Sequence, residues 1–493
     1  MMLTALIIIP VLCGLLGWAF GRGTSSFSRW ITLLGNVINL VIVALLWAGV
    51  GLSGAAGSAW LSEVNVPWIP GLGISFTLGL DGLSLTMLAL TAFLGIASVL
   101  ASWTGIRDRV RFFHFNLSLV LAGVNGVFLA LDLFLFAFFW ELMLVPMYFL
   151  IDIWGHENRH RAAMKFFLFT QIGGLLMLVA IIVLAVIHGM ATGSLSFDYR
   201  DLIGTQLSPV MGMLLMLGFF VAFAVKLPVF PLHTWLPDAH TEAPTAGSVV
   251  LAGLLLKTGG YGFIRFVIPL FPAVSRAFAP VALGLAVAGI IYGGFMAFGQ
   301  KDMKRLVAYT SVSHLGFVLL GVYAFNSLAL TGAVLQMVSH GISTGALFIL
   351  VGALQDRIHT RDLDRMGGLW KQAPRMGTAA MVLAMALVGL PGLLNFVSEF
   401  LVLLGAWQVN MLLSILAGLG LVVATIYALR MIQLSFHGSP RETWKVPDLS
   451  ARETAVLFVM IAALVVLGMF PQPLLRTVES VVAGVLAAAG GGA

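Results

Sequence analysis

The stretch LLMLGFFVAFAVKLP (residues 214–228) places a lysine inside an almost uninterrupted apolar run and follows it, two residues later, with a proline. An ionisable side chain in hydrocarbon costs roughly 2.5–3.5 kcal/mol on insertion scales, so it is retained where it faces protein or a water path. Pro228 has no amide hydrogen and breaks the helix beside Lys226. Three similar residues, Glu141, Lys257 and Glu399, also lie in apolar surroundings. Two acids and two lysines in this setting indicate proton transfer through the protein rather than redox chemistry or hydrolysis.

The composition indicates an integral membrane protein. The chain is 60% hydrophobic and 9% charged, with a mean hydropathy of +1.05, which no soluble globular domain approaches. Its 493 residues, at about 20 residues per span plus short loops, allow about fourteen transmembrane helices. We therefore expect an all-α fold in a single polytopic domain over residues 1–493. The net charge of +6 does not indicate a nucleic-acid partner, because the Lys and Arg residues lie in membrane loops.

Several other classes of protein are excluded by what the chain carries. A single cysteine, Cys13, excludes a disulfide framework and any iron–sulfur cluster held by this chain alone. The first apolar stretch, residues 3–20, has no basic residue ahead of it, so we do not expect a cleaved signal peptide. Only His314 and His340 are predicted near the middle of a span. We therefore expect the chain to bind no cofactor and no metal ion.

The charges of the loops predict how the chain crosses the membrane. The predicted helices are 2–20, 29–51, 81–104, 112–131, 132–151, 162–188, 210–230, 244–268, 277–299, 304–323, 327–355, 376–407, 409–435 and 453–472. Residues 60–80 are predicted as an extracytoplasmic strand hairpin or loop. Most Lys and Arg residues fall on one set of alternating connections, and only Arg200, Arg265, Arg276 and Arg476 fall on the other. The positive-inside rule then places both termini on the periplasmic side.

Two predicted spans are interrupted by proline. In the seventh span, Pro228 and Pro231 lack backbone donors, so the carbonyls of Ala224 and Leu227 are expected to lose their helical partners. In the twelfth span, Pro391 lies within the apolar run VGLPGLLNF. Non-helical backbone is tolerated at membrane depth only against protein or a water-filled cavity. Both breaks therefore indicate an interior, polar part of the bundle.

The positions of the two breaks also predict an internal repeat. Interrupted helices at matching places in two oppositely oriented halves are typical of inverted repeats and of a transport path. We expect the first repeat at residues 112–268 (helices four to eight) and the second at 277–435 (helices nine to thirteen). Two unrelated proline kinks are the alternative interpretation.

The long motif GFFVAFAVKLPVFPLHTWLPDAHTEAPTAGSVVLAGLLLKTGGYGFIRF (218–266) resembles the signature of the antiporter-like proton-pumping subunits of respiratory complex I, the NADH–quinone oxidoreductase. Three further stretches are similar to the same family: FFWELMLVPMYFLI (138–151), KDMKRLVAYTSVSHLGFVLLG (301–321) and GLPGLLNFVSEF (389–400). The resemblance covers roughly residues 80–440, and the long motif is highly specific. Within the family, the length and the acid at Glu399 are most similar to the M type, since the L and N types carry a lysine at that position.

The resemblance implies what the chain does and with what it assembles. It implies proton translocation in a bacterial inner membrane, coupled to electron transfer from NADH to quinone in other subunits. The implied partners are the other membrane subunits of complex I, with sibling antiporter-like subunits on both sides, and membrane lipids. FMN, iron–sulfur clusters and quinone are implied on the partner subunits rather than on this chain.

Three rival functions compete with this interpretation. The nearest is a subunit of a multisubunit Na⁺/H⁺ antiporter, which shares these motifs. A haem-bearing cytochrome subunit needs axial ligands, usually paired histidines on facing helices, and would leave the buried lysines without a role. A purely structural membrane scaffold does not explain four embedded charges.

The resemblance also assigns residues. It assigns proton translocation to Glu141, Lys226, Lys257, His314, His340 and Glu399. Asp132 has a family counterpart near the membrane edge and is a candidate for proton access. Asp238, in the motif LPDAH (236–240), is a candidate for entry from the cytoplasm, although a capping or turn role fits it equally well.

Each assignment has an alternative in which the residue transfers no proton. A pair formed by Glu141 and Lys226 would be switched by moving the lysine, but a fixed structural ion pair is also possible. Alternatively, the aliphatic side chain of Lys226 extends so that its ammonium group reaches the membrane–water interface. Lys257 is expected to bond to Tyr261, one helical turn away, or to be merely structural.

The histidines and the last acid have alternatives of the same kind. His314 and His340 suit a proton relay, because histidine titrates near physiological pH, or they are packing residues with satisfied hydrogen bonds. Glu399 suits a release site near an outer loop, or it pairs with a cation from a neighbouring helix.

Overall fold

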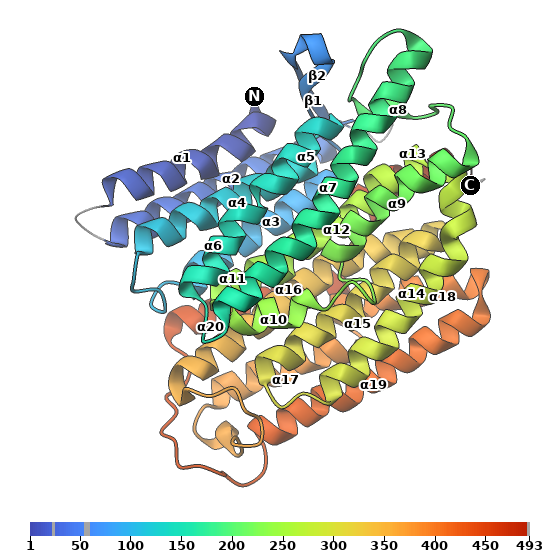
Figure 1. Cartoon of the computed structure of the whole chain (residues 1–493). Helices are drawn as coiled ribbons and strands as arrows, with labels where there is room; N and C mark the ends of the chain where they lie inside the picture. Colours follow the sequence, from blue (N-terminus) through green and yellow to red (C-terminus); the bar gives the residue numbers. More distant parts are fainter. Residues whose placement is uncertain (22–24, 54–59, 491–493) are drawn as a thin grey trace.

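The computed structural model describes residues 1–21, 25–53 and 60–490 and places them in one bundle of long helices that run side by side (Figure 1). Within these residues, thirteen helices are long and apolar enough to cross a membrane. Helices α17 and α18, which are shorter, follow one another where the remaining span is expected. The all-α membrane fold predicted from the composition is confirmed.

The elements follow the chain in this order. The first half contains α1 (Met2–Phe20), α2 (Ser25–Ser53), β1 (Ser62–Ile69), η1 (Pro70–Leu72), β2 (Ile74–Leu80), α3 (Gly82–Ala101), α4 (Val110–Leu129), α5 (Leu133–Leu142), α6 (Leu144–Trp154), α7 (Arg159–Thr192), α8 (Tyr199–Leu202), α9 (Pro209–Lys226) and α10 (Trp235–Glu242). The eighth predicted span is divided into α11 (Thr245–Val250), η2 (Leu251–Leu255), α12 (Leu256–Gly262), η3 (Phe263–Val267) and α13 (Ile268–Leu270). The second half contains α14 (Pro272–Phe298), α15 (Met303–Tyr323), α16 (Ser327–Ile358), η4 (Leu369–Lys371), α17 (Pro374–Val388), α18 (Leu394–Val409), α19 (Met411–Ser435), α20 (Ala451–Met469) and α21 (Gln472–Ala488).

The hairpin predicted at residues 60–80 is confirmed and marks one end of the bundle. Strands β1 and β2 pair antiparallel, with Ser62 opposite Leu80, and they project at the end where α1 begins (Figure 1). Gly73 closes the turn with φ +67°, and a Cβ there would lie 2.1 Å from the carbonyl oxygen of Leu195. We call this end the hairpin face. The opposite end, formed by the connections 102–109, 155–158, 299–302, 359–373 and 436–450, is the loop face.

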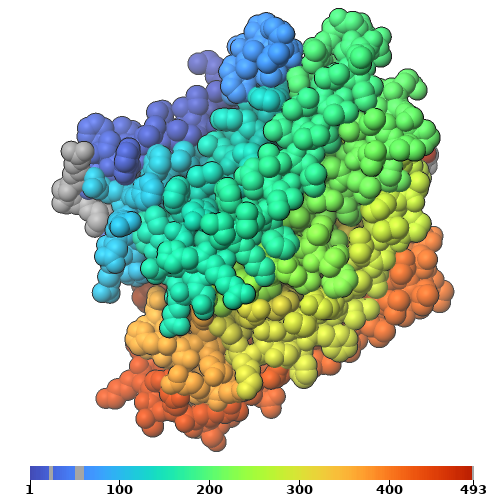
Figure 2. All heavy atoms as spheres, in the orientation of Figure 1, coloured from blue at the N-terminus to red at the C-terminus, as the bar shows by residue number. Residues whose placement is uncertain are grey.

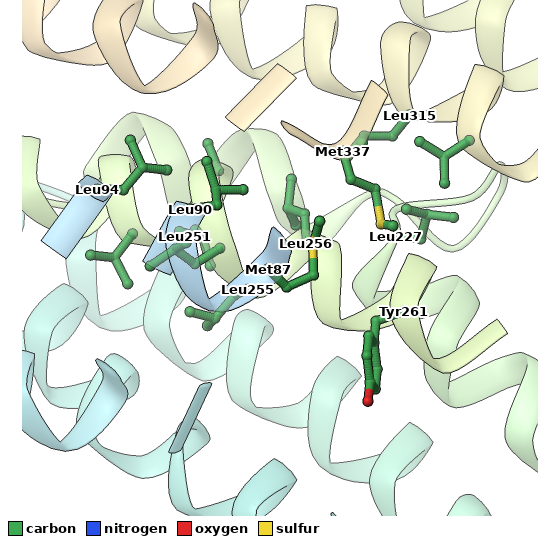
Figure 3. Packing of buried hydrophobic residues seen from close by; sticks show 14 of the residues in the cluster. Met87, Leu90, Leu94, Leu227, Leu251, Leu255, Leu256, Tyr261, Leu315 and Met337 are labelled. Carbon is green, nitrogen blue, oxygen red and sulfur yellow. The ribbon is translucent and has the colours of Figure 1, made fainter. Parts of the chain in front are cut away.

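The innermost helices are the ones whose polar residues matter most. The central parts of the spans 245–270, 303–323 and 327–358 are entirely buried within the bundle, whereas only about a fifth of the central part of α20 is buried. A helix that is apolar all round and buried belongs to a protein interior. The buried segment η2 packs against α3 through large apolar side chains, with Leu251 and Leu255 near Leu90 and Leu94 (Figure 3).

The two halves of the chain lie next to one another across this interior. Figure 2 shows residues of the first half, coloured blue to green, along one side and those of the second half, yellow to red, along the other. Most of their outward side chains are apolar, including Val179, Leu214, Phe295 and Leu412, each more than half exposed. Such a surface fits contact with lipid or with apolar faces of other subunits.

The backbone is not helical at 227–234, between α9 and α10, or at 389–393, between α17 and α18. The carbonyl of Ala224 loses its helical partner to Pro228, as expected, but it accepts a hydrogen bond from the amide of Val229 at 2.8 Å instead. The chain turns so that the amide five residues on reaches this carbonyl. The indole of Trp235 donates to the carbonyl of Val225 at 2.9 Å, so the end of α9 is largely satisfied. The inverted repeat over 112–268 and 277–435 stays a prediction.

Close packing between α16 and α18 predicts a sensitive glycine. A Cβ on Gly332 would lie 2.7 Å from the amide nitrogen of Val402 and 2.8 Å from the carbonyl oxygen of Ser398. We expect Gly332→Val to force these helices apart and to lower the amount of assembled, folded protein several-fold. The matched control is Gly284→Val, because nothing lies within 4 Å of a Cβ there. Equal yields of the two variants, measured by fluorescence size-exclusion chromatography, would contradict the packing argument.

Candidate functional site

The centre of the bundle holds a buried lysine–histidine contact. Lys257 Nζ lies 2.6 Å from His340 Nδ1 and donates to the carbonyl of Ala252 at 2.5 Å. Both side chains are essentially unexposed. The π-helical turn η2 precedes Lys257 and η3 begins six residues after it. Such wide turns are rare and are frequent at functional sites.

A second contact joins an acid to a histidine. His314 Nδ1 lies 2.7 Å from Glu399 Oε1, and the other ring nitrogen, Nε2, lies 3.0 Å from the hydroxyl of Tyr427. The amide of Gln336 donates to the same Glu399 oxygen at 3.0 Å. Glu399 and His314 are each 1% exposed. The alternative for Glu399 was a cation from a neighbouring helix, and the structure places a histidine of the candidate path at that position.

The two contacts lie next to each other. The rings of His314 and His340 are 6.3 Å apart between centroids. Serines beside them link the same helices, because Ser339 Oγ lies 3.1 Å from Ser398 Oγ. Four of the six residues assigned to translocation thus form one row, Lys257–His340–His314–Glu399, supplied by α12, α16, α15 and α18.

The other two assigned residues are not joined in the same way. Lys226 Nζ has no hydrogen-bond partner in the part of the chain that the structure describes. It lies over the rings of Trp140 and Phe166, 5.3 and 5.4 Å from their centroids, which is a cation–π arrangement. Glu141 is half-buried against α7, where its Oε1 would lie 2.1 Å from a Cβ on Gly174. Since Lys226 is 1% exposed, its ammonium does not reach an interface, and that alternative is wrong.

Each of the two helix breaks lies next to one of these charged residues. Lys226 is the last residue of α9, and Pro228 and Pro231 lie in the non-helical stretch that follows it. Pro391 lies in the second stretch, where Gly389 has φ +74° and its added Cβ would lie 3.0 Å from Glu399 Oε2. Each interruption thus directly adjoins one of the buried charges.

Two expectations about single residues, Tyr261 and Asp132, need correction or refinement. The hydroxyl of Tyr261 does not bond to Lys257: it lies 3.1 Å from Ser84 Oγ and donates to the carbonyl of Phe128 at 3.0 Å. Lys257 and Tyr261 both lie in the regular helix α12, but the ammonium of Lys257 turns toward His340 on α16, whereas the tyrosine hydroxyl reaches α3 and α4. Asp132, completely buried, caps α5 through the amides of Phe134 and Leu135.

Asp238 has a role that neither sequence interpretation named. Its carboxylate pairs with Lys165 at 2.6 Å and with Arg305 at 2.8 Å, so it joins three helices instead of capping one. Burial raises the pKa of Asp238, but the two cations together lower it more, and the net shift is downward. The carboxylate is therefore ionised at neutral pH.

Sequence reasoning missed two buried residues near the loop face. Lys304, counted as a loop cation, is 1% exposed at the start of α15 and donates to the carbonyl of Ala243. His240 is completely buried in α10, its ring stacked 4.6 Å from Phe348, and in the described residues neither ring nitrogen has a partner. The motif LPDAH already contained His240, whereas the charged segment around Lys304 gave no signal of burial.

A cavity of about 590 Å³ opens on the loop face near these residues. Among its lining residues are His156, Glu242 and Asp302. Burial lowers the pKa of His156 to about 4, with Lys304 and Arg361 contributing, so its imidazole is neutral at pH 7. In residues 1–21, 25–53 and 60–490, no three His, Cys, Asp or Glu side chains are grouped so that they could hold a metal ion.

A polytopic bundle with titratable side chains buried at its centre is typical of a membrane transport protein. Comparison with known proteins is more specific. Residues 130–425 match the model of the family described as NADH:quinone oxidoreductase/Mrp antiporter, transmembrane. The chain is 51% identical over 485 residues to NADH-quinone oxidoreductase subunit M of Pseudomonas aeruginosa, covering 96% of this chain and 95% of that protein. It is 49% identical over 496 residues to subunit M of Escherichia coli strain K12, covering 98% and 97%.

A solved structure shares the fold over the whole length. A chain of the respiratory complex I from Thermus thermophilus with bound NADH superposes with a TM-score of 0.88 at 32% identity, covering 99% of both chains. The protein belongs to the NADH:quinone oxidoreductase/Mrp antiporter family, in the branch of the subunit M proteins of NADH-quinone oxidoreductase.

The hydrogen bond from Gln336 to Glu399 predicts a stability effect. Leaving a buried acceptor without its donor costs about 1–3 kcal/mol, and more when the acceptor is charged. We expect Gln336→Met, which keeps the volume, to lower the thermal unfolding midpoint of the solubilised protein by several degrees. Gln355→Met is the control, because Gln355 is half-buried at the loop face and its nearest contact, with His156, is 3.4 Å long. Identical midpoints for both variants would show that the amide contributes nothing.

Proposed function

We propose that this chain is a proton-translocating membrane subunit of NADH–quinone oxidoreductase, located in a bacterial inner membrane. The observation that carries the proposal is the buried row Lys257–His340–His314–Glu399, in which neighbouring groups are within hydrogen-bonding distance at two of the three steps. Such groups are costly in a membrane interior and are retained where protons or ions move. The nearly full-length similarity to subunit M proteins supports the same function.

The geometry suggests how a proton would move along the row. Lys257 hands a proton to His340 Nδ1, and the opposite nitrogen, Nε2, has no partner among the described residues. That nitrogen is free to release a proton toward His314. Both nitrogens of His314 are engaged, by Glu399 and Tyr427, so this step requires a water molecule or a rotation of one ring. Glu399 is the last acceptor of the row.

Lys226 and Glu141 control the entry of protons into the proposed path, at the end opposite to Glu399. The ammonium of Lys226 rests on aromatic rings without a hydrogen-bond partner in the described part of the chain, and the non-helical stretch beyond it lets its backbone move. Approach to Glu141 stabilises both charges, and separation favours transfer of the lysine's proton toward Lys257. Moving one charge against 100 mV costs about 2.3 kcal/mol, which corresponds to under two pKa units at about 1.36 kcal/mol each.

Access to the row is assigned to both faces. Asp238, with its two cations, lies at the entry side near the loop face, and Asp132 lies near the hairpin face. The loop face is cytoplasmic and both termini are periplasmic in this proposal, since the loop face carries most of the cations. Pro228, Pro231 and Pro391 keep the two broken helices open for water, and the halves 112–268 and 277–435 form the two inverted repeats.

The redox chemistry belongs to partner subunits in this proposal. FMN, iron–sulfur clusters and quinone are held by other chains of the complex, and the single cysteine of this chain fits that division. Sibling antiporter-like subunits flank it on both sides. A subunit of a Na⁺/H⁺ antiporter of the Mrp kind is the second candidate, because one family model covers both groups. Identification of co-purifying chains by mass spectrometry separates the two functions.

Removal of the acid at the switch is the first test. We expect Glu141→Gln to abolish proton pumping by the assembled complex, because the neutral amide no longer attracts the ammonium of Lys226. Pumping is measured in reconstituted vesicles during NADH oxidation with a pH-sensitive dye. Normal pumping by the fully assembled Glu141→Gln complex would contradict the role of Glu141 in proton translocation.

The ends of the path provide a second test. We expect Lys226→Ala and Glu399→Ala each to reduce proton uptake per NADH at least about tenfold, the effect of losing roughly 1.4 kcal/mol of coupling or more. NADH oxidation with an artificial electron acceptor should persist, since it is carried out by other subunits. Lys371→Ala is the matched control, because that lysine is exposed in the loop face. Retained pumping in both path variants, with assembly intact, refutes the proposal.

A further inference from the structure

A cavity of about 200 Å³ lies at the hairpin face, outside the row described above. Its lining includes Trp60, Asp81, Tyr199, Arg265, Ser480 and Val485. Ile203, also in the lining, is 41% exposed, so the cavity opens to the surface. Arg265 was expected in an outer loop, but it is only 5% exposed.

A stripe of polar residues leads from the central lysine to this cavity. Lys257, Tyr261 and Arg265 follow each other at intervals of four along the eighth span, a spacing that keeps side chains near one face of a helix. Lys257 and Tyr261 are completely buried. A proton that entered from the cavity would therefore meet Arg265 first, Tyr261 next and Lys257 last.

The hydroxyl of Tyr261 has no capacity left for passing a proton. A phenol has one donor and two acceptor positions. The hydroxyl donates to the carbonyl of Phe128 at 3.0 Å, accepts from Arg265 Nε at 3.2 Å, and lies 3.1 Å from Ser84 Oγ. All three positions are used, and none is directed at Lys257.

The carboxylate beyond Tyr261 is equally engaged. Asp81 Oδ1 accepts from the amide of Ser84 at 2.9 Å, and Oδ2 accepts from Arg265 Nη2. The guanidinium of Arg265 also lies over the rings of Trp60 and Tyr261, 5.0 and 5.4 Å from their centroids. An arginine does not lose its proton in proteins, so it acts as a fixed positive charge.

Helix α21 holds this pair in place. A Cβ on Gly82, the residue after Asp81, would lie 1.6 Å from the carbonyl oxygen of Thr477. The helix therefore packs directly on the start of α3, and its residues Ser480 and Val485 complete the cavity wall. This contact provides a structural role for the last helix.

We propose that Arg265, held by Asp81 and backed by Tyr261, is a proton barrier that prevents protons from returning to Lys257 through the hairpin-face cavity. This inference rests on the proposed function, because a barrier is needed only if Lys257 carries protons. A fixed cation repels a hydronium ion strongly where the dielectric constant is low. Channels that must exclude protons use an arginine in the same way. Arg265 is thus a positioning and excluding residue that never itself transfers a proton.

The test measures passive proton leak in phospholipid vesicles that contain the assembled complex, with an imposed pH gradient and no NADH. We expect the double variant Asp81→Asn/Arg265→Gln, which strands no charge, to dissipate the gradient several-fold faster than the wild type. Asp81→Asn alone keeps the arginine cation and should leak at the wild-type rate. Arg276→Gln, an exposed arginine on the same face, is the matched control and should also leak at the wild-type rate.

Three results would overturn the barrier. They are a wild-type leak in the assembled double variant, a leak in Asp81→Asn as large as in the double variant, and a leak that persists when Lys257→Met is added to the double variant. If the glutamine variant does not assemble, Arg265→Met with Asp81→Asn replaces it, because neutral groups of similar volume are commonly tolerated in place of a buried ion pair. Because no NADH is present, failure here is distinguishable from failure of the pumping function, which Lys257→Met tests during NADH oxidation.

Discussion

The structure depends on the high free energy of charged groups in a medium of low dielectric constant. A carboxylate or ammonium withdrawn from water is stable only when another group replaces the lost hydration. In this bundle α12, α15, α16 and α18 meet where Lys257 contacts His340 and His314 contacts Glu399. Helices at the outside of the bundle present many apolar side chains outward.

Irregular backbone and buried charge occur together throughout the molecule. The non-helical stretches adjoin Lys226 and Glu399, and π-helical turns flank Lys257. A regular helix uses all its own carbonyls, whereas a break or a wide turn leaves some of them for side chains. Ala252 and Ala243 show the result, since each carbonyl accepts a hydrogen bond from a buried lysine. Local departures from the α-helix are therefore part of the solvation of the charges.

The sequence predicted the membrane class and the hairpin, because long apolar runs and their interruptions are local signals. The roles of the six residues assigned to translocation came from the family resemblance, and they stay a prediction. The sequence did not predict contacts. Arg265 and Lys304 looked like loop cations, since their burial depends on helices far away in the chain. Tyr261 was expected to bond to Lys257 on the basis of helix spacing, but each side chain finds its partner on a different neighbouring helix. The pairing of Gln336 and Tyr427 with the row was likewise invisible without the fold.

The complete engagement of His314 has a consequence for proton transfer. Its two ring nitrogens are tied to Glu399 and Tyr427, so turning the imidazole breaks two hydrogen bonds at once. In the proposed path, transfer by rotation of this ring would have to open both contacts, whereas transfer through a water molecule would leave them intact.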